Sequence, residues 1–430
     1  MKYKMIIRKL LLVLALIGTG QTLADDNKGS IQINDDFFGL HIRWGAISTP
    51  WPFVRFQSWR VITPETEWRG LQPQRGVWKF DVLDRAIALS QEHDVDVILT
   101  LGQTPPWASA RPTEPSANNL GNSAEPSDNA DWDRYVRAVV SRYRGKIKYY
   151  ELWNEPYYSD LRGYTTKGHF SGSVASMVKL AKIARQVINE IDPNAKLISP
   201  SCTGGETIGL ECTEAFLKAG GAQLVDIIGF HFYMLPERIP GMVTKIHTQM
   251  QKYGVRNLPL WNTESGYLVN GTDKATAAIM NLGDPFDFVL TQDALPGYVL
   301  RSMVFAAMSG ITRYYHFSWD IPTMHLMWKK GTEPTPASTG YAQSVRWLRG
   351  ATLTDMKNEG GIVSCSITSR AGHKGMLIWS TGGMRNYTIP DTFSLVGYEK
   401  ISGAFIQRKA ATNVEVDESP ILIRQETALW

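Results

Sequence analysis

Two glutamates stand in closely similar local sequences far apart in the chain. Glu155 lies in the segment WNEP and Glu264 in the segment WNTESG, and each follows an apolar run typical of a strand. Cleavage of a glycosidic bond by double displacement needs two carboxylic acids, one to protonate the leaving oxygen and one to attack the anomeric carbon. The pair therefore predicts a retaining glycosidase with Glu155 and Glu264 as its catalytic residues.

The elements that must position these glutamates alternate between short apolar strands and amphipathic helices. Eight strand candidates are expected at 38–42, 59–62, 95–101, 147–154, 196–199, 227–231, 258–263 and 313–317. Helices with one apolar face are expected at 132–143, 174–188 and 338–349. Eight β/α units over residues 25–350 predict a TIM barrel, whose chemistry lies at the C-terminal ends of its strands. Both glutamates fall there, on the fourth and seventh strands.

The pattern changes after Gly350. Short alternating runs separated by Gly, Pro, Asn and Asp are found at 362–368, 375–380, 385–389, 400–406 and 421–424. This pattern predicts a small β-sandwich domain over residues 351–430. Such a domain either buttresses the barrel or binds carbohydrate, and the sequence leaves both open.

The first residues are typical of an export signal. Four basic residues precede an apolar run at 10–17, and Thr22-Leu23-Ala24 offers small residues at a cleavage site. We expect a signal peptide over residues 1–24 and a periplasmic or secreted enzyme. An uncleaved membrane anchor is the alternative, although the run is shorter than the roughly 20 residues that span a bilayer.

Charge and cysteine content limit the partners. The formal charge of +4 comes from 45 basic and 41 acidic residues, and four of the basic residues lie in the leader. The remainder is balanced and gives no reason to expect nucleic acid as a partner. Cys202 and Cys212 either form a disulfide that closes a loop or remain two free thiols, and Cys365 is expected in the core. No Cys/His spacing predicts a metal site, and no cofactor is expected.

Further segments carry a resemblance to a known family. Arg60 on the second strand is followed by Trp68, the segments LQP at 71–73 and WKF at 78–80, and LGQTPPWA at 101–108. Together with the two glutamate motifs, these segments resemble clan A glycoside hydrolases, and family 39 in particular. The resemblance implies a TIM barrel, retaining chemistry, Glu155 as acid/base and Glu264 as nucleophile.

The resemblance also implies roles for neighbouring residues. Arg60 would help to keep Glu264 ionised, or would form a structural ion pair under the mouth of the barrel. Asn154 would donate to the sugar 2-hydroxyl, or would only cap the turn after the fourth strand. His231 and Tyr233 alternate onto one face at the end of the sixth strand. Tyr233 would hydrogen-bond the nucleophile, or would be a core tyrosine with its hydroxyl satisfied elsewhere.

Aromatic residues are the candidates for sugar contacts, because sugar C–H faces stack on rings. Trp319 after the eighth strand would form the floor of the sugar site. Trp107 would be a second platform, or only an anchor for its loop. Less distinct candidates are His41, Trp44, Tyr157, Tyr158, Tyr164, Tyr267 and Trp328.

The loops at the catalytic end are long, at 104–130, 232–241, 265–295 and 320–336. Loops of this length favour an endo-acting groove for a polysaccharide, although they can also fold inwards and make a pocket. The resemblance further implies an exopolysaccharide as the substrate and membrane-associated exopolysaccharide machinery as a partner, and we expect the enzyme to be a monomer. The alternatives are an exo-acting enzyme resembling β-xylosidases, and a non-catalytic polysaccharide-binding protein on the same scaffold.

Overall fold

In the computed structural model, the described residues are 29–161, 168–269, 289–321, 324, 326–390, 393, 396–407 and 413–425. The predicted leader, most of the predicted loop 265–295, Tyr164 and the side chain of Trp328 lie outside this description.

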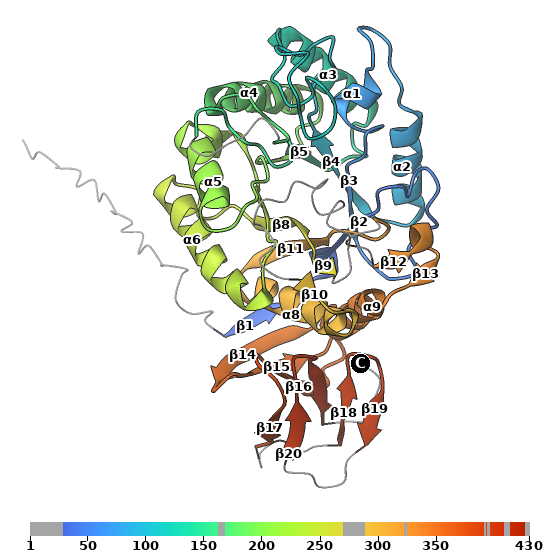
Figure 1. Cartoon of the computed structure of the whole chain (residues 1–430), viewed down its shortest axis with the longest axis vertical. Helices are drawn as coiled ribbons and strands as arrows, with labels where there is room; N and C mark the ends of the chain where they lie inside the picture. Colours follow the sequence, from blue (N-terminus) through green and yellow to red (C-terminus); the bar gives the residue numbers. More distant parts are fainter. Residues whose placement is uncertain are drawn as a thin grey trace, which may run out of the picture.

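Eight parallel strands form the barrel that the sequence predicts (Figure 1). They are β2 (Phe38–His41), β3 (Ser58–Val61), β4 (Asp96–Leu101), β5 (Tyr149–Leu152), β6 (Lys196–Ile198), β7 (Ile228–His231), β8 (Leu260–Ser265) and β11 (Ile311–His316). Their order is β6-β5-β4-β3-β2-β11-β8-β7, and an isolated bridge between Ile198 and Ile227 joins the two ends. The eight strands predicted from apolar runs are therefore confirmed.

Helices form the outer layer around the strands (Figure 1). They are α1 (Trp68–Leu71), α2 (Asp81–Glu92), α3 (Asn129–Arg142), α4 (Val174–Ile191), α5 (Ile208–Lys218), α6 (Ile239–Lys252), α8 (Leu295–Met308) and α9 (Pro336–Leu348). Helix α4 begins after Ser173, whose side chain accepts a hydrogen bond from the Ser176 N–H, and ends at Asp192, one residue before a proline. The three predicted helices are α3, α4 and α9.

Short elements lie in the connections. The 3-10 helices are η1 (Asp35–Phe37), η2 (Gly221–Leu224), η3 (Pro236–Arg238), η4 (Gln292–Ala294) and η5 (Lys329–Gly331). Two-residue strands are β9 (Leu268–Val269), β10 (Val289–Leu290), β12 (Met327–Trp328) and β13 (Glu333–Pro334).

The C-terminal residues form a separate, antiparallel sheet in the order β1-β14-β15-β16-β21-β18-β19. Its strands are β1 (Ser30–Gln32), β14 (Thr352–Glu359), β15 (Ile362–Thr368), β16 (Lys374–Ser380), β18 (Gly397–Lys400), β19 (Phe405–Gln407) and β21 (Ile421–Arg424). A two-stranded ribbon of β17 (Arg385–Thr388) and β20 (Asn413–Val416) packs against it through Ile378, Val414 and Ile423.

Two details of this sheet differ from the sequence prediction. The single strand expected at 400–406 is wrong, because Lys400 N–H donates to Ala404 O across a turn that separates β18 from β19. The first described strand, β1, pairs with β14 and so joins the C-terminal sheet, whereas the predicted domain boundary assigns it to the barrel. Alternation alone does not indicate which distant strand a short segment will pair with.

The sheet and the barrel share a buried contact around Glu399. This residue is 4% exposed and accepts hydrogen bonds from Gln343 Nε2 at 3.0 Å and from Arg346, both on α9. The ring of Phe305 on α8 meets Trp379 on β16 edge-on, with centroids 5.7 Å apart. These contacts favour the buttressing role for the domain.

The open question about the cysteines has a clear answer in the structure. Cys202 and Cys212 form a disulfide with a Cα–Cα distance of 6.0 Å, which ties the segment after β6 to helix α5. Cys365 is a buried free thiol on β15, as expected.

Candidate active site

The two glutamates lie together at the C-terminal ends of their strands. Glu264 is on β8, and Glu155 follows β5 by three residues. Glu155 has a positive φ of 39°, and its N–H donates to Ser201 O at 3.1 Å. A left-handed backbone is costly for a residue with a side chain and is found most often at functional sites. Oxygens of the two carboxyl groups lie within 4.8 Å of each other.

Arg60 on β3 donates hydrogen bonds to three polar side chains of the site. Its Nη1 donates to Glu264 Oε2 at 2.7 Å, and its Nη2 donates to Asn154 Oδ1 at 2.8 Å. Its Nε donates to Glu151 Oε2 at 2.7 Å, and the Arg60 side chain is fully buried. The two roles considered for Arg60 are therefore combined, since it contacts Glu264 and also forms a structural ion pair.

Glu151, the partner in that ion pair, was not among the predicted site residues. It is fully buried on β5 and also accepts from Thr100 Oγ1 at 2.7 Å and Ser201 Oγ at 2.6 Å. Its signal in the sequence is a charged residue within the apolar run YYEL. A buried charge of this kind requires a partner of opposite charge, which is Arg60.

His231 and Tyr233, which the sequence places on one face at the end of β7, each contact one of the two glutamates. The Tyr233 hydroxyl donates to Glu264 Oε1, so the hydrogen bond predicted from the sequence is present. His231 Nδ1 lies 2.8 Å from Glu155 Oε1 and 3.9 Å from Glu264 Oε1. Glu155 therefore has His231 as its partner and Glu264 has Tyr233, both from the end of β7 and the residues that follow it.

Burial and hydrogen bonding both affect the pKa of the two carboxyl groups. Burial raises the pKa of Glu155. Burial also raises the pKa of Glu264, while the charge of the Arg60 guanidinium acts in the opposite direction. Both Glu264 oxygens accept hydrogen bonds, from Arg60 and Tyr233, and such bonds favour the charged form. Glu264 thus has the direct contact with the Arg60 guanidinium, at 2.7 Å, that favours a carboxylate.

The nearby imidazoles are neutral at neutral pH. Burial lowers the pKa of His231 to about 4. Its Nε2 is buried without a hydrogen-bond partner. An orphaned lone pair costs less than an orphaned N–H, so the proton is assigned to Nδ1, which donates to Glu155. His41 lies on the other side, with Nε2 3.0 Å from Thr263 O and 4.0 Å from Glu264 Oε2.

The structure does not place every aromatic candidate where its ring could contact a sugar. Trp319 is 1% exposed and packs against Phe53, so it presents little of its ring to a sugar. Phe317 is partly exposed, and its ring meets that of His41 edge-on with centroids 5.1 Å apart. The chain reaches Ser318 through a cis peptide bond from Phe317. The position of the ring two residues before Trp319 was not predicted from the sequence.

Trp107 is held as a loop anchor. Its indole N–H donates to Gln72 O at 2.8 Å, and its ring meets Trp68 edge-on and carries Arg75 above one face. The platform role for Trp107 remains a prediction that these contacts do not favour.

The other aromatic candidates divide by exposure. Tyr158 and Tyr267 are fully buried, whereas Tyr157 and Trp44 are partly exposed. The Trp44 backbone N–H donates to Asp320, which fixes the loop after β2.

Within the described residues, Glu155, His231 and Glu264 form a group whose geometry would suit a metal ion. Glu264 already accepts hydrogen bonds on both oxygens, one of them from the Arg60 guanidinium. A cation there would face a permanent positive charge, so the donor set fits proton and glycosyl transfer better than a metal.

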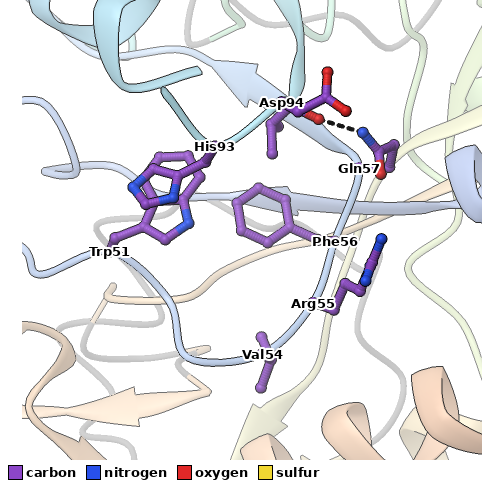
Figure 2. A pocket seen from close by; sticks show the side chains of 8 residues that line it. Trp51, Val54, Arg55, Phe56, Gln57, His93 and Asp94 are labelled. Atoms are coloured by element: carbon purple, nitrogen blue, oxygen red, sulfur yellow. Dashed lines mark hydrogen bonds between the residues drawn. The ribbon is translucent and has the colours of Figure 1, made fainter. Parts of the chain in front are cut away.

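A hollow of about 320 Å³ is lined by residues of the segments that contain Trp51 and His93 (Figure 2). Its lining residues precede β3 and β4, so it is at the N-terminal ends of the strands. Trp51 stacks on His93 at 4.1 Å and on Phe56 at 5.3 Å. Both contacts occupy the Trp51 ring, which is therefore no free platform for a ligand.

Comparison with known proteins agrees with this geometry. Residues 53–257 match the model of glycosyl hydrolase family 10. A family 39 glycoside hydrolase from the gut symbiont Bacteroides cellulosilyticus WH2 has 16% identity, a TM-score of 0.63, and coverage of 91% of this chain and 82% of that one. The chain is a glycoside hydrolase with the clan A fold.

Other similar structures come from different families of glycoside hydrolases. A family 39 β-xylosidase from Caulobacter crescentus has 14% identity, a TM-score of 0.63, and coverage of 92% of this chain and 97% of that one. A family 30 subfamily 8 xylanase from Clostridium acetobutylicum has 17% identity, a TM-score of 0.60 and the same coverage. Identities this low show a common fold, and the family 10 match ends before Glu264, so the family within the clan stays open.

Proposed function

We propose that the protein hydrolyses glycosidic bonds with retention of configuration, with Glu264 as nucleophile and Glu155 as acid/base. The observation that supports this most directly is the proximity of the two carboxyl groups, because one oxygen of Glu155 lies within 4.8 Å of one oxygen of Glu264. Retaining enzymes place the two carboxyl groups about 5–5.5 Å apart, whereas inverting enzymes need about 6.5–9.5 Å to admit a water.

In the first half-reaction, the Glu264 carboxylate attacks the anomeric carbon while Glu155 transfers its proton to the leaving oxygen. Arg60 and Tyr233 orient the nucleophile, because each holds one of its oxygens. Esterification then removes the charge of Glu264. The pKa of Glu155 falls as that negative neighbour disappears, which suits Glu155 to accept a proton from the incoming water.

Asn154 is oriented for a contact with the sugar. Its Oδ1 accepts from Arg60 Nη2 at 2.8 Å, which fixes the amide and leaves Nδ2 as a donor. A donor at this position suits the 2-hydroxyl, whose hydrogen bond strengthens in the oxocarbenium-like transition state.

We further propose an endo-acting enzyme for an exopolysaccharide. The long loops support a groove, and the sequence motifs, taken together with the leader and the C-terminal sandwich, resemble the periplasmic Psl exopolysaccharide glycosidase PslG. The structural likeness to a family 39 β-xylosidase supports the exo-acting alternative. Product size separates the two, since an exo-acting enzyme releases monosaccharide from the first minutes and an endo-acting enzyme releases oligosaccharides. A purely polysaccharide-binding protein would release neither.

The proposed site of action is the periplasm or the exterior of the cell, as a monomer beside the exopolysaccharide machinery. The leader supports this proposal through its basic and apolar segments. Among the described residues, no helix has the length and apolar character needed to cross a membrane.

The test of the mechanism is the replacement Glu264→Ala, assayed with an activated aryl glycoside. The rate should fall by on the order of 10⁵-fold, as for other enzymes that lose their nucleophile. Sodium azide should restore turnover and give the glycosyl azide of inverted configuration. Glu214→Ala is the matched control, because Glu214 contacts Lys252 on the surface. Near-normal activity of Glu264→Ala would show that the nucleophile is another residue.

A further inference from the structure

A second imidazole faces the proposed acid/base. His169 Nε2 lies 3.8 Å from Glu155 Oε2, opposite the oxygen that His231 contacts. The His169 side chain is 29% exposed, so it is open to a ligand in a way that His231 is not. No motif in the sequence indicated this residue, and the mechanism above gives it no role.

The main chain holds His169 firmly at this place. Its carbonyl oxygen accepts from Trp153 Nε1 at 2.5 Å and from Gln103 Nε2 at 3.3 Å. An isolated parallel bridge between Pro156 and Phe170 fixes the residues that follow Glu155 and His169. His169 is therefore positioned by the turn that also carries Glu155.

Hydrogen bonding determines which nitrogen of His169 carries the proton. Asn118 Nδ2 lies 3.4 Å from His169 Nδ1 and also donates to Gln103 Oε1 at 2.9 Å. An amide NH₂ can only donate, so His169 Nδ1 is the acceptor and Nε2 carries the hydrogen. Burial lowers the pKa of His169, which is consistent with a neutral ring. The Nε2–H donor thus points towards Glu155.

The two histidines also determine which oxygen of Glu155 transfers its proton. His231 Nδ1–H occupies Oε1, so the transferable proton belongs on Oε2. The 3.8 Å between Oε2 and His169 Nε2 is too long for a direct hydrogen bond. An oxygen atom of the substrate or of a water molecule placed between the two side chains would accept a hydrogen bond from His169 Nε2–H. The same oxygen would exchange a proton with Glu155 Oε2.

We propose that His169 is a positioning residue that holds the oxygen served by Glu155. In a retaining enzyme this oxygen belongs to the departing sugar in the first half-reaction and to the attacking water in the second. In the second step the water oxygen bonds to the anomeric carbon, its proton moves to Glu155 Oε2, and the bond from that carbon to Glu264 breaks. The electron pair returns to Glu264. The inference rests on the proposed retaining function.

The test uses the 2,4-dinitrophenyl glycoside of the monosaccharide or oligosaccharide that the wild type releases as its product. This leaving group needs no protonation, so attack of water limits turnover and the initial burst counts active sites. His169→Phe keeps a ring but removes the donor. We expect an unchanged burst and a steady rate per active site about tenfold lower, the value of one hydrogen bond. His169→Gln restores an N–H donor and should recover part of the rate.

Control variants and outcomes distinguish this proposal from a structural role. His247→Phe on α6 removes a half-buried histidine outside the site and should behave as the wild type. A rate per active site equal to wild type in His169→Phe would overturn the proposal, as would a loss confined to the burst amplitude. A wild type that forms no glycosyl-enzyme with a 2-deoxy-2-fluoro glycoside, as measured by mass spectrometry, would overturn the retaining function itself and the proposal with it.

Discussion

Two buried arginines on barrel strands, Arg60 and Arg313, lie at opposite ends of the barrel and have different kinds of partner. Arg60 at the catalytic end contacts the carboxylates of Glu151 and Glu264. Arg313 at the other end lies between the rings of Tyr149 and Trp261, at 4.6 and 4.5 Å from their centroids. Its ion pairs are longer, 3.1 Å to Asp36 and 3.4 Å to Asp96.

The difference indicates what each end of the barrel does. The charge around Arg313 is the same in every state of the protein, so aromatic faces and partly exposed carboxylates can stabilise it permanently. The charge around Arg60 changes when Glu264 becomes an ester. Glu151 takes no part in the proposed reaction, and its contact with Arg60 keeps that side chain in place through the change. The following predictions test this contrast.

The largest effect is expected for Glu155→Gln. Substrates with poor leaving groups should lose about 10²–10⁴-fold in kcat/KM, because general acid help is worth that much. Dinitrophenyl glycosides should keep most of the first-step rate, and the basic limb of their pH profile should disappear. An equal loss for both kinds of substrate would mean that Glu155 only positions the sugar.

Arg60→Met should reduce both activity and stability. The rate should fall by about 10²–10³-fold, as for loss of a preorganised donor to a charged group. The free energy of unfolding should fall by about 3–5 kcal/mol, because Glu151 is left charged and buried without its partner. The double variant Arg60→Met/Glu151→Gln should recover stability in urea denaturation without recovering the rate. Recovery of the rate as well would show that Arg60 serves the fold alone.

Tyr233→Phe should have a smaller effect with a defined pH signature. The Tyr233 hydroxyl stabilises the charged form of Glu264, so its removal should raise the pKa of that group. The acidic limb of kcat/KM should move to higher pH by roughly one unit, the scale of one hydrogen bond. The basic limb should stay in place. An acidic limb that does not move would assign that limb to a different group.

Arg313→Met should leave kcat/KM unchanged, which makes it the control for Arg60→Met. Loss of two ring contacts should lower the free energy of unfolding by about 2–3 kcal/mol, measured by urea denaturation. A fall in kcat/KM comparable to that of Arg60→Met would remove the contrast between the two ends.

The features that could be predicted from the sequence are those that a local pattern of residues encodes. The barrel was predictable because buried parallel strands are continuous apolar runs and the helices between them have one apolar face. The glutamate pair was predictable because each member ends such a run. Glu151 breaks its run and could have been noticed for that reason.

Other parts of the site depend on contacts that no local pattern encodes. His169 reaches Glu155 through a bridge between two loop segments, and its orientation depends on Asn118 in a third. Trp319 is buried whereas Phe317 is partly exposed, and residue type alone does not reveal which of the two reaches the surface. Long loops without periodicity leave such positions undetermined.

The pairing of β1 with β14 has a consequence for the order of folding. Ser30–Gln32 must find Thr352–Thr354, so the whole barrel lies inside the loop that this pairing closes. Contacts this distant in sequence form late, because the entropy of closing the loop is lost before the contact contributes. We therefore expect the N-terminal strand to remain unpaired while the barrel assembles. β1 would then pair with β14 last, and this pairing would cover an edge of β14 that could otherwise pair with another chain.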